Sequence, residues 1–124
     1  MRDRQIEWLC VWELIRFEVR GALFGYRAIA GDLGCVRDVR AAGVEARVER
    51  AFANVVAFYP RTVLCLQSSV ATARVLRRLG VAAEVIIGFR PSPFLGHAWV
   101  EVGGRVVNDS SGIPRMMLVL DRLS

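Results

Sequence analysis

A cysteine, a histidine and an aspartate follow one another in the carboxy-terminal half of this 124-residue chain. Cys65 opens a stretch with helical spacing, His97 is the only histidine, and Asp109 ends a short apolar run. In acyl transfer by a cysteine, the thiolate attacks a carbonyl carbon, an imidazole accepts the thiol proton, and a carboxylate orients the imidazole. The order of these residues predicts a triad with Cys65 as nucleophile, His97 as general base and Asp109 as orienting group.

The setting of Cys65 distinguishes it from the other two cysteines. A thiol with a pKa of ~8.5 is a poor nucleophile at neutral pH, but a helix amino terminus and an adjacent imidazole favour the thiolate. Cys10 and Cys35 have no such setting, so we interpret both as structural, the commoner role of a free cysteine. Three widely spaced cysteines do not indicate a disulfide framework, and a zinc site that included His97 would lack closely spaced ligand pairs. No metal or cofactor is expected.

The strand predicted around His97 sets a condition on the triad. Alternation along the strand places His97, Trp99 and Glu101 on one face of the sheet. Trp99 would then line the site and exclude water from the imidazole. The alternative for Trp99 is simple packing in the core. A regular two-residue turn at Gly103 and Gly104 would put Asp109 on the opposite face. The triad therefore predicts an odd loop or a bulge in this hairpin.

Hydrophobic spacing and turn residues predict the elements that position these groups. They indicate an α+β fold in one domain, residues 1–124, with a helical segment and connector over 1–43 and a catalytic core over 44–124. The expected helices cover about 5–30 (one helix, or two broken near Gly21), 44–59 and 65–79. The expected strands cover 83–87, 97–102 and 105–109, with a loop over 88–96 and a short closing helix or edge strand over 114–120.

Charge and composition narrow the classes of partner. The formal net charge is +5, and all 17 basic residues are arginine, which suits an acidic peptide or an acidic partner surface. Nucleic acid is not expected, because the arginines are spread along the chain and no phosphate-binding loop is present. The amino terminus lacks a secretory signal and its charges exclude a membrane span, so a cytoplasmic location is expected. Loose membrane contact is an alternative that we do not favour.

The amino-terminal helix has a wider apolar face than one core contact needs. We favour the interpretation that it covers the catalytic core, because small domains need their apolar residues for the core. The alternative is a surface that docks a partner, with Trp8, Trp12 and Arg16 as anchors, because Trp and Arg are favoured at interface hot spots.

Five segments resemble those of a known family. They occur in order with suitable gaps: Cys65-Leu66; Arg77-Arg78-Leu79-Gly80-Val81; Ile86-Ile87-Gly88-Phe89-Arg90; Pro93-Phe94; and the run from His97-Ala98-Trp99 to Val107-Asn108-Asp109. On these segments the chain resembles the transglutaminase-like cysteine protease of lasso-peptide biosynthesis, the leader peptidase often called the B protein. The resemblance implies a papain-like core, with the nucleophile at a helix amino terminus packed on a small antiparallel sheet. It also implies a Cys-His-Asp triad that maps onto Cys65, His97 and Asp109.

The resemblance further implies a substrate and partners. Such a peptidase removes the leader from a ribosomally made precursor before an asparagine-synthetase-like cyclase, using ATP, forms the macrolactam. Fused members carry a winged-helix leader-recognition domain, for which too few residues precede Cys65. The chain therefore resembles the stand-alone protease half, which implies a separate recognition protein. Two alternatives stay open: another acyl-transfer enzyme on the same residues, such as a transglutaminase or an amidase, and a non-catalytic scaffold that binds precursor and cyclase.

Overall fold

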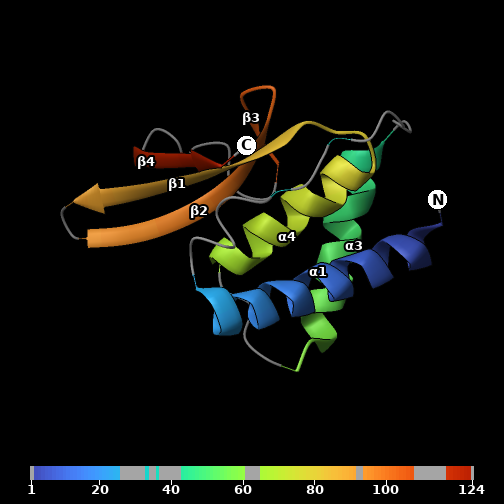
Figure 1. Ribbon diagram of the computed structural model, residues 1–124. Helices are drawn as coiled ribbons and strands as arrows, with labels where there is room; N and C mark the ends of the chain where they lie inside the picture. The colour runs from blue at the N-terminus through green and yellow to red at the C-terminus, as the bar shows by residue number, and fades with distance from the viewer. Residues whose placement is uncertain are drawn as a thin grey trace.

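In the part of the chain that the structure describes, three helices are followed by a four-stranded antiparallel sheet, which confirms the α+β prediction (Figure 1). The computed structural model describes residues 2–25, 33, 36, 43–60, 65–91, 94–107 and 117–123. The helices are α1 (Asp3–Phe24), α3 (Val44–Phe58) and α4 (Cys65–Arg78). The strands are β1 (Ala83–Pro91), β2 (Phe94–Val102), β3 (Arg105–Val106) and β4 (Leu118–Leu123), in the spatial order β3-β2-β1-β4.

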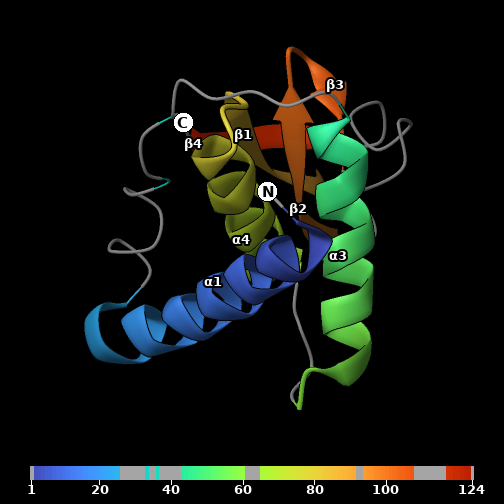
Figure 2. The same cartoon turned by 90° about the vertical axis from the view of Figure 1, so that its right-hand side faces the viewer.

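Helix α4 is the central element of the fold. It packs against α1 and α3 on one side and against β1 and β2 on the other, while α1 crosses α4 on the side away from the sheet and its amino-terminal half lies against α3 (Figure 2). Its apolar stripe includes Val70, Ala73 and Leu76, all buried, and the helix ends before Gly80, whose φ of 89° is left-handed. Helix α1 is a single helix through Gly21, so the prediction of one unbroken helix is the correct alternative.

The predicted loop over 88–96 is wrong. Strands β1 and β2 pair continuously from Ala83 opposite Val102 to Pro91 opposite Phe94, so most of that segment is strand. The glycines and prolines of this segment favour a loop, but hydrogen bonding to neighbouring strands outweighs that preference. Gly88 and Phe89 of β1 pair with β4 as well as with β2. Pro91 is tolerated at the last position of its strand, where a missing N–H costs little.

The hairpin between β2 and β3 is a regular two-residue turn. Gly103 and Gly104 have φ values of 57° and 78°, which suit a primed turn that matches the twist of the strands. Val102 lies opposite Arg105, and the Val107 N–H donates to the Val100 carbonyl at 2.9 Å, so the register continues without a bulge. The predicted odd loop or bulge at this turn is therefore wrong. The rest of the predicted third strand, including Asp109, lies outside the described residues.

Strand β4 settles the choice left open for the closing segment. It is an edge strand, begins at Leu118 and pairs with β1. Its last residue Leu123 joins the main core with Val85 and Val100, on the sheet face that packs on the helices. The opposite face carries a smaller cluster of Ile86, Trp99 and Met117. Within the described part of the chain, no helix has the length and apolar character needed to cross a membrane.

Candidate active site

Cys65 is the first residue of α4, and its thiol is exposed. An exposed thiol at the end of a helix is open to a substrate. Cys10 differs in both respects: it lies buried in the middle of α1, and burial, with smaller contributions from Glu7 and Glu13, raises the pKa of its thiol to about 12. The prediction that Cys10 is structural agrees with this environment, whereas Cys35 lies outside the described residues.

The first turn of α4 is anchored by α1. Gln67, two residues after Cys65, donates a buried side-chain hydrogen bond at 3.1 Å to the backbone carbonyl of Leu14. A carbonyl inside a helix already accepts one backbone hydrogen bond, so Gln67 uses its second lone pair. The contact holds the start of α4, and hence the Cys65 backbone, in a fixed position on α1.

A buried ion pair between the same two helices was not anticipated from the sequence. Glu13 is 1% exposed. Its carboxylate forms ion pairs with the Arg74 Nε at 2.6 Å and with the Arg78 Nε at 3.2 Å. Charged residues are seldom buried unless they are paired. A signal was present, because Glu13 lies between Cys10 and Leu14 on the apolar side of α1, where a lone carboxylate needs a cation.

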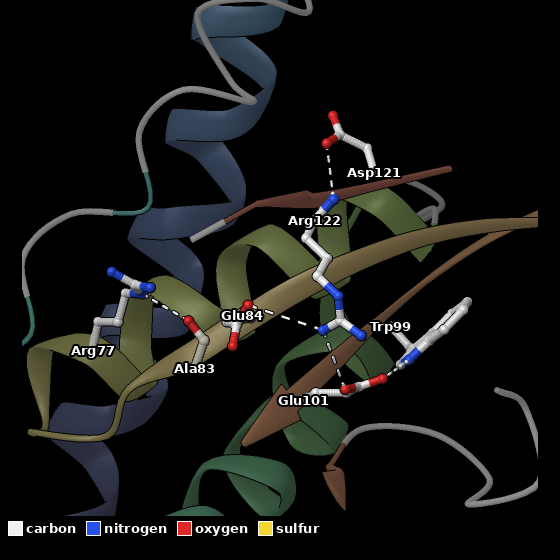
Figure 3. A network of polar contacts seen from close by, with 7 residues as sticks. All are labelled: Arg77, Ala83, Glu84, Trp99, Glu101, Asp121 and Arg122. Carbon is white, nitrogen blue, oxygen red and sulfur yellow. Dashed lines mark hydrogen bonds and ion pairs between the residues drawn. The ribbon is translucent and has the colours of Figure 1, made fainter. Parts of the chain in front are cut away.

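The imidazole of His97 lies beside a large buried aromatic ring. His97 is half-buried in β2, and its ring stacks on Trp99 with centroids 6.3 Å apart and planes inclined by 24°. Trp99 is fully buried, and its indole Nε1–H donates to the Glu101 carboxylate at 2.8 Å. Arg122 of β4 reaches Glu101 at 3.6 Å and Glu84 at 4.0 Å (Figure 3). The indole is thus held by a hydrogen bond to a carboxylate that is itself ion-paired.

Gly88 is a second residue that the sequence analysis did not single out. It lies opposite His97 in the β1–β2 ladder, and a Cβ at this position would approach the Trp99 ring to 2.8 Å. Only glycine leaves room for the indole there. A glycine inside a strand is a known mark of such close approach, so the signal was available once the strand was recognised.

The thiol and the imidazole come from two elements that pack together, α4 and β2. Ala98 and Val100 belong to the core shared with α4, so strand alternation places His97 on the opposite face of the sheet. Of the predicted site residues, the structure brings His97 and Trp99 into contact. It shows no hydrogen bond between Cys65 and His97, both of which it describes, and Asp109 lies outside its described residues.

A cavity of about 470 Å³ lies along the Cys65 side of α4. Ser68 and Thr72 line it, three and seven residues after Cys65, on the same side of the helix. The other lining residues are Glu49, Phe52, Ala53, Val56 and Val107. A larger groove of about 750 Å³ runs between α1 and α3, and includes neither Cys65 nor any residue of α4 or the sheet. Cys65 does not line the smaller cavity either, but of the two only the smaller is lined by residues of α4, the helix that begins at Cys65. Among the described residues, no three acidic, histidine or cysteine side chains cluster as a metal site would require.

Sequence comparisons give two matches. The sequence model of the transglutaminase-like superfamily matches residues 11–118. The chain is also 41% identical over 56 residues to the microcin J25-processing protein McjB of Escherichia coli, a stretch that covers 45% of this chain and 27% of that protein. No solved structure matches the chain significantly.

Proposed function

Because the chain belongs to the transglutaminase-like superfamily, we propose that it is a cysteine peptidase that removes the leader from a lasso-peptide precursor. The observation that carries the proposal is the exposed Cys65 at the start of α4, inside the matched region. Similarity to a protein named for processing microcin J25 supports a peptide precursor as substrate. The reducing cytoplasm, where precursor peptides are made and thiols stay free, is the compartment we assign.

The proposed reaction uses the three residues in the roles expected from the sequence. Strand alternation puts His97 on the sheet face away from α4, so the proposal requires the imidazole to turn toward the Cys65 end of α4 when substrate binds. There His97 accepts the thiol proton, and the thiolate attacks the scissile carbonyl. The tetrahedral intermediate collapses to a thioester as the leaving amine takes the proton from His97. Water, deprotonated by His97, then hydrolyses the thioester and releases the leader with a free carboxylate. Asp109 would fix the imidazole tautomer.

The proposal places a requirement on the chain after Val107. If the regular register of the β2–β3 hairpin continued, Asp109 would lie opposite Ala98 on the helix-covered face, away from the His97 ring. The triad therefore requires the chain to leave this register between Val107 and Asp109. Trp99 would act as a wall that keeps water from one side of the imidazole, since it is stacked beside it.

We propose further that the outer face of α1 docks a partner protein. Trp8 and Trp12 are 69% and 56% exposed on this face, and Arg16 lies one turn further along the helix. The inner face of α1 covers the core, so the two interpretations of this helix apply to its two faces. The partners we propose are a winged-helix leader-recognition protein, which delivers the precursor, and an asparagine-synthetase-like cyclase, which receives the product.

A cleavage assay tests the function. Purified chain and recognition protein are incubated with the precursor peptide, and the products are identified by mass spectrometry. We expect a free leader with a new carboxylate, its formation slowed at least about 10³-fold by Cys65→Ala and unchanged by Cys10→Ala.

Other products would contradict the proposal. Full maturation with Cys65→Ala would indicate a scaffold. Transfer of the acyl group to an added amine in preference to water would indicate a transglutaminase. His97→Gln and Asp109→Asn then test the triad, and an unchanged rate for either variant removes that residue from it.

A further inference from the structure

The cavity beside α4 has an apolar lining with one charged residue. Phe52, Val56 and Val107 supply apolar surface, and Glu49 is the only ionisable group among the lining residues that the structure describes. A volume of about 470 Å³ is well above that of one side chain and lies within the range of sites that enclose small ligands. The cavity therefore suits a group with an apolar body and a cationic end.

The cavity begins one helical turn from the proposed nucleophile. Ser68 is three residues after Cys65, which places it about one turn of 5.4 Å further along the same side of α4. Val107 closes the cavity from the sheet, two residues before Asp109. A substrate residue near the bond attacked at Cys65 can thus extend its side chain along α4 toward α3, where Glu49 lies.

The charges around Glu49 leave its carboxylate incompletely balanced. Arg105 pairs at 2.7 Å with Glu45, one turn before Glu49 on α3. Partial burial and the negative charge of Glu45 raise the pKa of the Glu49 carboxyl, against an opposing effect of Arg105. A second cation in the cavity would be attracted to both carboxylates. On a chain of net charge +5, this cavity is a locally acidic place, contrary to the general expectation of an acidic ligand.

We propose that Glu49 is a specificity-determining residue, and that the cavity receives a basic side chain of the peptide substrate. The aliphatic stem of a lysine or arginine would lie along Phe52 and Val56, and its charged end would meet Glu49. Such side chains commonly bury the stem and keep the charge at a polar rim. This inference rests on the proposed role of Cys65 as nucleophile.

Two alkylating probes test the preference without a precursor or a partner. Nα-iodoacetyl-lysinamide and Nα-iodoacetyl-norleucinamide differ mainly in the terminal ammonium group. Each forms one S–C bond to Cys65, with loss of iodide and of the thiol proton. The rate at Cys65 is followed by peptide mapping and mass spectrometry, and is divided by the rate of each probe with glutathione.

We expect the normalised lysine probe to react roughly two- to fivefold faster at Cys65, the range of a partly exposed ion pair. Glu49→Gln should bring the ratio close to one, and Glu49→Arg should lower it below one. Glu84→Gln, which removes a carboxylate on the far face of the sheet, should leave the ratio unchanged. A ratio of one in the unaltered protein, or a ratio unaffected by Glu49→Gln, would overturn the specificity role while leaving a reactive Cys65 in place. Failure of both probes to alkylate Cys65 would overturn the proposed function, and this inference with it.

Discussion

Helices α4 and α1 pack against each other but differ in which of their residues are exposed to solvent. Every residue of α4 from Ser69 to Leu76 is buried, and small residues such as Ala71 and Ala73 let its neighbours approach closely. Only the two ends of α4 are open, and one of them presents Cys65. Helix α1 is buried along one side only and exposes large apolar side chains on the other. These are Trp8, Trp12, Ile15, Val19, Leu23 and Phe24.

The difference separates two kinds of exposed group. A thiol at the free end of a helix that is otherwise enclosed is held in place by packing, as an attacking group must be. A row of aromatic and aliphatic side chains along a helix flank supplies area, which is what an interface with another protein needs. This contrast supports the proposed division of roles, with chemistry at the start of α4 and partner binding on the outer face of α1.

In the described part of the chain, each of the two helices carries one cysteine. The rates at which the two thiols are labelled therefore compare the two environments directly. With iodoacetamide at neutral pH, Cys65 should react at least about 10³-fold faster than Cys10, because Cys10 is enclosed and its thiol pKa is raised to about 12. Peptide mapping by mass spectrometry measures both rates. In urea the two rates should converge, and comparable rates without urea would remove the distinction between the helices.

The inner side of α1 should be sensitive to loss of charge. Glu13→Ala leaves Arg74 buried without its carboxylate, and we expect the free energy of unfolding to fall by about 3–5 kcal/mol. Urea unfolding followed by circular dichroism measures the change. Replacing both partners by apolar residues, Glu13→Leu with Arg74→Met, should restore most of the loss.

A carboxylate on the same helix serves as control. Glu7 accepts only an exposed hydrogen bond from Asn54 at 3.3 Å, so Glu7→Ala should cost no more than about 0.5 kcal/mol. If Glu13→Ala were equally mild, the pair would not join α1 to α4 in the way the structure indicates.

The outer side of α1 should show the opposite behaviour. Trp8→Ala and Trp12→Ala should change the free energy of unfolding by less than about 0.5 kcal/mol, because both side chains are already largely in water. Each should slow partner-dependent cleavage about tenfold, as expected for an interface anchor. The measurement is the cleavage rate with and without the recognition protein. Leu120→Ala on β4, at 68% exposure, is the matched control. A strong loss of stability with no change in the partner effect would assign the tryptophans to the core.

Local signals in the sequence were sufficient to predict the helices and to select Cys65 and His97 as candidate catalytic residues. The spacing of Val70, Ala73 and Leu76 specifies one side of α4, and Gly80 marks its end, because periodicity and left-handed glycine are properties of neighbouring residues. The pair Gly103 and Gly104 likewise specifies a primed turn. Cys65 and His97 were recognisable because a thiol at a helix start and a single histidine can be identified without knowledge of distant contacts.

Contacts between segments far apart in the chain decided the rest. Gly88 and Pro91 look like loop residues until β2 and β4 pair with their strand, since ladder hydrogen bonds join segments that no local pattern relates. Glu13 becomes a buried ion-pair partner only when α4 brings Arg74 to it, 61 residues later. The cavity that places Glu49 near the Cys65 side of α4 exists because α3, α4 and Val107, the residue after β3, meet there. Burial and charge balance depend on this packing. Residue type and position in the sequence therefore select the candidate reactive residues, and tertiary packing sets which groups surround them.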